Sequence, residues 1–440
     1  MTAPAGPTDR RALASVAACF AVNGMVYASF VPRLPDIRDR AGISIGALGV
    51  VLMLGSVAGV VASFLTGPVI GSFGTRRVLV VSAALSVGAL PVIGVARGPV
   101  VLVVGLVAVL FFDVFMDVSM NVQGSVLSAR RHAPVMNRLH GLWSLATVTG
   151  GLVTAAVVAA GVSVPVHLTV VAALLLVVMA AVAPGLLPVD EPHTDTGDER
   201  HHAGAADGPA APVDDDTVGV PGGPLHLGTT SEAVAGSPVD GTAPATTARP
   251  PVGGSRRRVA MVLGLGGACA MALELTAGDW AAFRLGDDLG TSGQVAAAGF
   301  VAFTVGMTTG RLGGDSVQVR LGVERLLVVA SVLAGVGLAV AELAPGSGLV
   351  LVGFLVAGLG VSVLFPQLYD AAARAPGPTG SGFTSMLLGQ RTAALLTPLT
   401  VGALAATEAL DVGTAMAVVS LPAATLSLGL AIDRLRRSRG

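Results

Sequence analysis

Long uninterrupted apolar runs are the feature that most constrains this chain. A helix needs about 20 apolar residues to cross a hydrocarbon layer of ~30 Å, and every backbone polar group in lipid must be hydrogen-bonded within its own segment. The runs therefore predict an all-α polytopic membrane protein with twelve transmembrane helices. They lie at roughly 12–32, 46–70, 78–96, 99–123, 141–161, 164–185, 258–281, 294–313, 326–343, 349–371, 384–407 and 413–432.

The composition supports this fold class and excludes two others. Only 12% of the 440 residues are charged, against about 25% in a soluble domain, so much of a solvated surface is missing. A soluble enzyme is excluded on this ground. The net charge of −1 also argues against a protein that binds nucleic acid.

The arginines and cysteines argue against several kinds of functional site. All 26 basic residues are arginine, and without a lysine the chain cannot build a P-loop nucleotide site. Cys19 and Cys269 are the only cysteines and lie inside apolar runs, which favours packing over a disulfide or a metal site. With no nucleophile–base pair and no metal-ligand cluster, we expect neither enzyme activity, nor a metal, nor a cofactor.

The positions of the arginines predict the orientation. With the N-terminus inside, seventeen arginines fall on the inner side and five on the outer side, Arg33, Arg38, Arg40, Arg97 and Arg284. Because positive residues collect in cytoplasmic loops, both termini are expected in the cytoplasm. The expected location is the inner or plasma membrane of the cell.

The chain divides into two related halves joined by a polar linker. Residues 72–81 (SFGTRRVLVV) resemble residues 320–329 (RLGVERLLVV), 248 positions later. Between them, residues 186–256 are rich in Pro, Gly, Asp and Thr and lack apolar periodicity, so disorder is expected there. We predict six-helix bundles at 1–185 and 257–440, related by pseudo-symmetry.

One loop resembles the signature of a known family. Residues 67–77 (GPVIGSFGTRR) are similar to the loop between the second and third helices of the major facilitator superfamily, whose two six-helix repeats match this plan. The resemblance implies a gating loop that includes Gly67, Gly74, Arg76 and Arg77. It departs from the family at Gly71 and Ser72, where an Asp–Arg pair is usual.

Four further segments resemble one branch of that superfamily, the YbjJ-type and MosC-type proteins related to fucose permease. They are residues 30–37 (FVPRLPDI), 117–124 (DVSMNVQG), 139–145 (LHGLWSL) and 278–280 (GDW). The resemblance implies transport by alternating access and does not imply a particular solute.

Polar residues at membrane depth are the candidates for function, since each Asp or Arg there costs roughly 2.5–3.5 kcal/mol. In the first half, Asp113, Asp117 and Asn121 follow one another at intervals of four and share a helix face. Asn23 and Tyr27 lie one turn apart in the first helix. We expect Asp117 and Asp113 in proton coupling and Asn23, Tyr27 and Asn121 in solute binding, with an interhelical hydrogen-bond network as the alternative.

In the second half, Glu274 and Asp279 lie in the seventh helix and Gln390 and Arg391 in the eleventh. Glu274 is the better coupling candidate, because burial favours the protonated form of a carboxyl group and makes reversible proton uptake possible. Asp279, Gln390 and Arg391 are expected to bind solute, and Arg391 to have an acidic partner.

The remaining candidates lie nearer the cytoplasm. Gln367 in the tenth helix is expected to donate to a polar solute. Arg311 and Asp315, four residues apart, are expected to form a gate-side ion pair. His140 begins the fifth helix, and we expect a structural role for it rather than a role in proton transfer.

The leading hypothesis is a secondary transporter that couples protons to a small polar solute, resembling a sugar or cyclitol. Export of apolar or cationic compounds is the alternative within transport, and a non-transporting membrane sensor is the alternative from another class. The expected partners are the solute, protons and the lipid bilayer, with no nucleic acid and no nucleotide, and the expected assembly is a monomer.

Overall fold

A computed structural model describes residues 7–131, 135–188, 253–375, 381–407 and 409–438, and every regular element within these ranges is helical. The first half contains α1 (Pro7–Phe30), α2 (Leu34–Ala41), α3 (Ile45–Phe73), α4 (Thr75–Gly88), α5 (Leu90–Val95), α6 (Pro99–Arg130), α7 (Met136–Ala159) and α8 (Val164–Val182). The second contains α9 (Gly253–Phe283), α10 (Gly293–Leu321), α11 (Val323–Leu343), α12 (Ser347–Val361), α13 (Leu364–Ala373), α14 (Ser381–Ala405) and α15 (Val412–Arg437). Three single turns are η1 (Val31–Arg33), η2 (Ala183–Gly185) and η3 (Arg284–Asp288).

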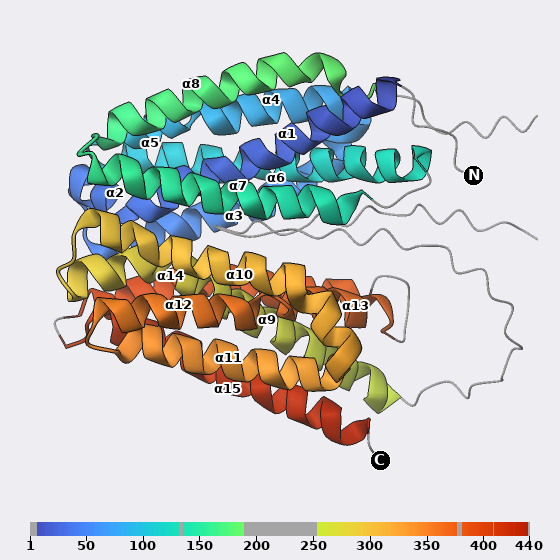
Figure 1. Ribbon diagram of the computed structural model, residues 1–440, viewed down its shortest axis with the longest axis vertical. Coiled ribbons are helices and arrows are strands. Elements are labelled where there is room, and N and C mark those ends of the chain that lie inside the picture. Colours follow the sequence, from blue (N-terminus) through green and yellow to red (C-terminus); the bar gives the residue numbers. More distant parts are fainter. Residues whose placement is uncertain (1–6, 132–134, 189–252, 376–380, 408, 439–440) are drawn as a thin grey trace, which may run out of the picture.

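The helices form two bundles that lie side by side, the first half above the second in Figure 1. Eleven helical segments among the described residues are long and apolar enough to cross a membrane. The short pairs α4–α5 and α12–α13 each make one of these segments. The one predicted span not among these segments, at 384–407, corresponds to α14, a 25-residue helix that contains Pro398. The predicted all-α polytopic fold is confirmed.

The two halves repeat each other with a constant offset of 248 residues over a long helix, the glycine that follows it and the turn that precedes it. α3 and α10 are both 29 residues long, from Ile45 to Phe73 and from Gly293 to Leu321. The glycines that end them, Gly74 and Gly322, have φ of 77° and 78°, a left-handed conformation that glycine adopts without strain. The preceding turns repeat as well, because Gly42 and Gly290 have φ of 63° and 60°. The repeat read from residues 72–81 therefore extends to residue 42.

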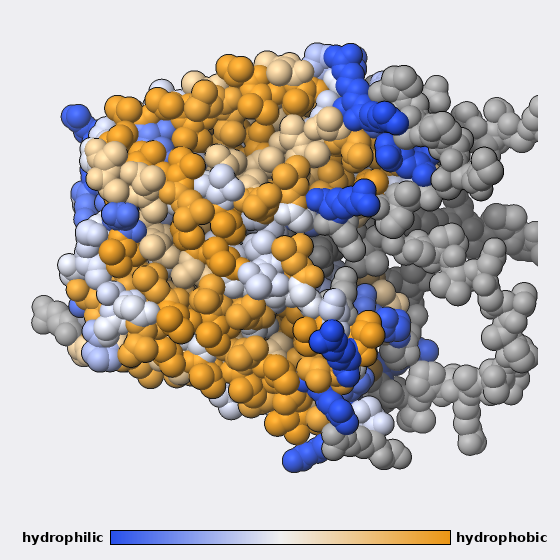
Figure 2. Space-filling view, viewed as in Figure 1, coloured by the Kyte–Doolittle hydropathy of each residue, from blue (hydrophilic) through white to orange (hydrophobic). Residues whose placement is uncertain are grey.

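An apolar belt surrounds the protein between two polar ends. Figure 2 shows apolar side chains over both bundles and hydrophilic side chains gathered at the ends of the helices. Among the exposed apolar residues are Phe64 (79% exposed), Val100 (73%) and Leu174 (61%). In water such a surface would be costly, whereas lipid chains are as apolar as these side chains. The belt is the surface of a multi-pass membrane protein.

The predicted linker begins inside folded structure. Gln123 on α6 donates to the carbonyl oxygen of Leu187 (2.9 Å) and accepts from its amide (3.0 Å), and Leu186 and Leu187 are both 2% exposed. At the other end, α9 already begins at Gly253. The predicted disorder concerns mainly residues 189–252, which lie outside the described residues.

The cysteines and the start of α3 add two details of the fold. Cys19 and Cys269 are free, buried thiols. Ser44 caps α3, because its hydroxyl accepts a hydrogen bond from the amide of Ala47 at 3.2 Å. A side-chain acceptor of this kind satisfies one of the unpaired amides at a helix start.

Small residues allow the closest helix contacts. At Gly389 on α14, a Cβ atom would lie 1.9 Å from the carbonyl oxygen of Gly264 on α9. Close backbone approach of this kind holds transmembrane helices together in the absence of a hydrophobic driving force.

We predict that Gly389→Ala destabilises the second bundle by about 1–3 kcal/mol, the usual cost of overpacking. Gly313→Ala on α10 is the matched control, because a Cβ there meets no atom within 4 Å. The midpoint of thermal unfolding in detergent should fall for the first variant alone. Equal midpoints for the two variants would contradict the packing seen at α9 and α14.

Candidate functional site

A chain of hydrogen bonds occupies the centre of the first bundle. Asn23 on α1 donates to Asp113 on α6 (Nδ2–Oδ1 2.6 Å), and Tyr27 donates to the other carboxylate oxygen (3.1 Å). The indole of Trp143 on α7 donates to Oδ1 of Asn23 (2.7 Å). All four side chains are at most 6% exposed. Three helices are thus joined around one carboxylate, which receives two hydrogen bonds.

Local sequence explains why these side chains meet. Asn23 and Tyr27 are one turn apart on α1 and so share a face. Between them, Gly24 lets α1 approach α7: a Cβ at this position would lie 2.7 Å from the carbonyl oxygen of Trp143. The tight crossing brings the indole N–H of Trp143 within reach of Asn23.

The predicted polar stripe on α6 continues towards the cytoplasm. Asn121 donates to the backbone carbonyl of Asp117 (2.9 Å) and to its carboxylate (3.1 Å). Asn121 therefore orients Asp117 along its own helix, and its place in solute binding stays a prediction.

The second bundle contributes two buried carboxylic acids from α9. Glu274 is 2% exposed and Asp279 is 1% exposed. Within the described ranges, neither carboxylate oxygen of Asp279 accepts a hydrogen bond. Both Asp117 and Asp279 lie within electrostatic range of the Tyr27 hydroxyl. Tyr27 is consequently the point where acidic groups of the two halves converge.

Helix α14 places two predicted residues against different neighbours. Gln390 is fully buried, packs on Gly267 of α9, and in the described part of the protein neither its amide nitrogen nor its oxygen has a hydrogen-bond partner. Arg391 reaches the first bundle, where it donates to the hydroxyl of Ser63 on α3 at 2.7 Å. The expected acidic partner of Arg391 stays a prediction.

Gln367 lies apart from the central group. Its amide donates to Oε1 of Gln318 on α10 at 2.6 Å, and its neighbour Asp370 forms an ion pair with Arg374 at 3.8 Å. The structure thus brings Gln367 to the contact between α10 and α13 rather than to Asp113 or Glu274.

Arg311, which was predicted for the inner gate, lies at one of two equivalent contacts between the halves. The largest contacts between the bundles are α3 with α14 and α7 with α10. Ser63 on α3 and Arg311 on α10 are equivalent in the 248-residue repeat. Arg311 lies within electrostatic range of His140 on α7. At the equivalent position of the first half, Ser63 contacts Arg391 on α14. The Asp315 side chain lies outside the described residues, so its ion pair with Arg311 stays a prediction.

The predicted gating loop is centred on Gly74, which separates α3 from α4. Gly67 on α3 has no atom within 4 Å of a Cβ position, and Arg76 and Arg77 begin α4, where Arg76 is half-buried and Arg77 exposed. The loop therefore joins α3 to α4 around Gly74, and the gating role of Gly67, Gly74, Arg76 and Arg77 stays a prediction.

The outer ends of the two bundles touch. Arg38 on α2 forms an ion pair with Asp287 of η3 and lies over the ring of Phe283 at 5.3 Å. On α3, a Cβ at Gly49 would lie 2.5 Å from the carbonyl oxygen of Pro398, whereas a Cβ at Gly71, at the opposite end of the helix, meets no atom within 4 Å. The halves are therefore closed against each other at the outer end.

Three participants were missed as site residues from the sequence. Trp143 was noted only within a family motif, and Ser63 is one small hydroxyl in an apolar helix. Arg38 was counted as an outer-loop charge, and its partner Asp287 is 249 positions away. A signal existed only for Trp143, whose indole N–H needs an acceptor when buried. In the described chain, no three His, Cys, Asp or Glu side chains form a group able to hold a metal.

We predict that Asn23 and Trp143 are energetically coupled. A double-mutant cycle with Asn23→Leu and Trp143→Phe should give about 0.6–1.7 kcal/mol, the range for interhelical hydrogen bonds in membranes. Unfolding by sodium dodecyl sulfate in mixed micelles measures it. The control cycle pairs Trp143→Phe with Gln123→Leu, which contacts Leu187 instead and should show no coupling. A similar value in both cycles would refute the hydrogen-bond chain.

Comparison with known proteins agrees with this architecture. The chain is 26% identical over 414 residues to the transporter y4wD of Sinorhizobium fredii, covering 94% of this chain and 96% of the relative. It is 24% identical to the membrane protein MosC of Rhizobium meliloti, covering 83% and 77%. A structure of the nucleoside transporter NupG superposes with a TM-score of 0.67 at 13% identity, covering 96% and 99%.

The family follows from a longer match. The family model of the Major Facilitator Superfamily matches residues 16–398, which include most of both bundles, except α15 and the end of α14, and all the polar residues described at the centre. The two bundles, the 248-residue repeat and this match agree that the chain belongs to the Major Facilitator Superfamily and is a membrane transporter.

Proposed function

We propose that this protein is a proton-coupled secondary transporter that moves a small polar solute by alternating access. One observation carries the proposal: acidic groups of both halves, the buried Asp113 and Asp279 and the half-buried Asp117, lie within electrostatic range of Tyr27. The buried Glu274 lies within electrostatic range of Asp279 on the same helix. Acidic residues at membrane depth are costly and usually mark a pathway for ions or solute.

Proton coupling is supported by the different settings of two of these acids. Asp113 accepts hydrogen bonds from Asn23 and Tyr27, an arrangement that stabilises its charged form. Asp279 is buried without such donors among the described residues, an arrangement that favours its neutral form. A site whose acids differ in their hydrogen-bond donors can load and release a proton when the halves move.

The alternating-access step is supported by the closed outer end. Opening the site to the outside would break the ion pair between Arg38 and Asp287 and separate Gly49 from Gly402. We propose that the conformation described is closed outside and open towards the cytoplasm. We also propose a monomer in the inner or plasma membrane with both termini in the cytoplasm.

A small polar solute is supported by the groups that line the centre. Asn23, Tyr27 and Gln390 offer donors and acceptors suited to hydroxyl groups, and the chain contains only two Trp and two Tyr. The resemblance to the fucose-permease branch favours a sugar or cyclitol. NupG, with the same fold, is a nucleoside transporter, which also fits a polar, uncharged class of solute.

Export of cationic compounds is the second candidate. The convergence of four carboxyl groups, Asp113, Asp117, Glu274 and Asp279, gives the centre an acidic character that attracts cations. Expression in cells distinguishes the candidates, since export would raise resistance to lipophilic cations and uptake of a polar solute would not.

We predict that Asp113→Asn and Glu274→Gln abolish pH-driven accumulation in proteoliposomes while solute counterflow continues. A neutral isostere mimics the protonated acid, so the exchange of solute survives and the link to the proton gradient is lost. Asp370→Asn is the matched control, because Asp370 pairs with Arg374 at an exposed position. If both central variants still concentrate the solute, the coupling assignment is wrong.

We also predict that Arg38→Gln favours opening of the outer end. Spin labels at Ser163→Cys and Gly348→Cys, in a background with Cys19 and Cys269 replaced by Ala, report the distance between the two bundles. The variant should add a population with a longer distance. Arg40→Gln, on the same helix, should not, since Arg40 is not paired with Asp287 in the described structure. Identical distributions for all three proteins would contradict the outer contact.

A further inference from the structure

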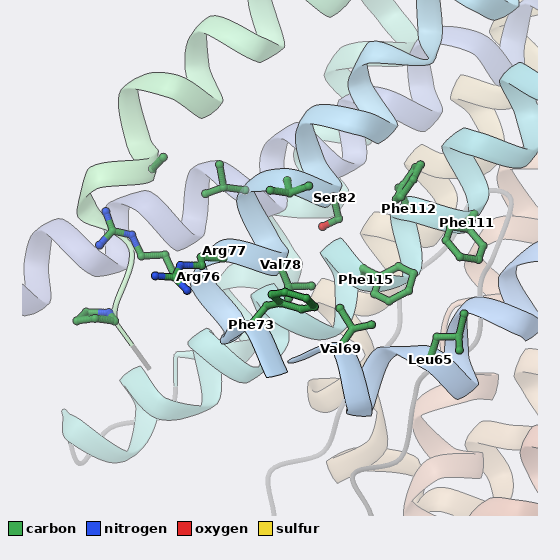
Figure 3. A pocket seen from close by; sticks show the side chains of 14 residues that line it. Leu65, Val69, Phe73, Arg76, Arg77, Val78, Ser82, Phe111, Phe112 and Phe115 are labelled. Carbon is green, nitrogen blue, oxygen red and sulfur yellow. The ribbon is translucent and has the colours of Figure 1, made fainter. Parts of the chain in front are cut away.

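A cavity of about 880 Å³ lies on the first bundle, away from the polar centre. α3, α4 and α6 form most of its walls, which are apolar apart from two arginines and Ser82. Figure 3 shows Arg76 and Arg77 at one end and Phe111 and Phe112 at the other. We call this cavity the α3–α4 groove.

The groove is separate from the transport site. Asp113 faces α1, where it binds Asn23 and Tyr27. Phe111 and Phe115 lie on nearly the opposite face of α6, because each residue advances a helix by about 100°. Their rings pack 5.3 Å apart. A ligand in the groove would therefore touch the back of α6 and not the solute.

The walls of the groove are open to lipid. Leu65 is 44% exposed, Phe73 59% and Val81 56%, and all three belong to the apolar belt. From Leu65 to Phe73 the groove follows α3 for about 12 Å at 1.5 Å per residue. This length is close to the ~15 Å depth of one leaflet, so the groove suits an acyl chain entering from the cytoplasmic leaflet.

The end of the groove carries positive charge, and no acidic residue among the described ones pairs with it. In the described part of the chain, neither Arg76 nor Arg77 forms an ion pair or a hydrogen bond with another residue. Gly71 stands where the resemblance to the family leads one to expect an Asp, so residues 67–77 contain no acidic residue to offset the two arginines. Two guanidinium groups at the membrane surface attract anionic lipid headgroups.

The equivalent loop of the second half is different. Glu324 occupies the position equivalent to Arg76 and pairs with Arg434 at 3.6 Å. Arg325, equivalent to Arg77, is exposed beside this pair. The second loop therefore carries an acidic residue, Glu324, between Arg320 and Arg325, whereas residues 67–77 of the first loop carry Arg76 and Arg77 and no acidic residue.

We propose that the α3–α4 groove is a binding site for an anionic glycerophospholipid. One acyl chain lies along Leu65, Phe73 and Phe115, and the phosphate lies against Arg76 and Arg77. Since these arginines belong to the gating loop and lie in the first turn of α4, the bound lipid would stabilise the inner end of the first bundle.

Native mass spectrometry of the full-length protein in detergent tests the site. Palmitoyl-oleoyl phosphatidylglycerol should bind more tightly than phosphatidylcholine with the same chains. Arg76→Gln with Arg77→Gln should weaken phosphatidylglycerol binding about thirtyfold, from ~1 kcal/mol for each arginine. The matched control, Arg325→Gln at the equivalent position, should leave it unchanged. Arg76→Lys with Arg77→Lys should retain it.

Several outcomes would overturn the proposal. Equal binding of the two lipids by the wild-type protein would show a groove without headgroup preference. Displacement of phosphatidylglycerol by millimolar inorganic phosphate would identify the arginines as a site for soluble anions. Should the double glutamine variant fail to fold, Leu65→Trp decides, because filling the groove must weaken phosphatidylglycerol binding if the acyl chain lies there.

Discussion

The cost of placing a charged or polar group in hydrocarbon governs this structure. Backbone groups avoid that cost because they are hydrogen-bonded within helices, and the side chains that face lipid are apolar. The few acids and arginines at membrane depth must turn inward or find partners. Asp113 does so by uniting α1, α6 and α7 around one carboxylate. The arrangement of both bundles around a polar centre follows from this constraint.

The same constraint makes the centre suited to transport. A carboxylate that is stable only when it is hydrogen-bonded or protonated is sensitive to any movement that changes its donors. Tyr27 is such a donor at the contact between the halves: it donates to Asp113 and lies within electrostatic range of Asp279 in the other half. In the proposed mechanism, a shift of one bundle against the other changes the protonation of the site and so links movement to proton binding.

The fold was predictable because its signals are local or repetitive. Apolar runs mark the spans, and the loop at Gly74 repeats at Gly322 with the same backbone conformation. The partners within the site were less predictable, because they depend on which helix faces combine. Arg391 was expected to have an acidic partner, and the contact observed is with the hydroxyl of Ser63, 328 positions away. The pairing of Arg38 with Asp287 joins two outer loops, and composition cannot distinguish it from two solvated charges.

The most direct test of this account is proton movement driven by solute in proteoliposomes of the wild-type protein. A pH dye enclosed in the vesicles is followed while sugars, cyclitols and lipophilic cations are added one at a time. The account predicts that a polar, uncharged solute changes the internal pH, and that the change disappears when a proton ionophore removes the gradient. Movement of a labelled solute with no change in pH would contradict proton coupling through the central acids.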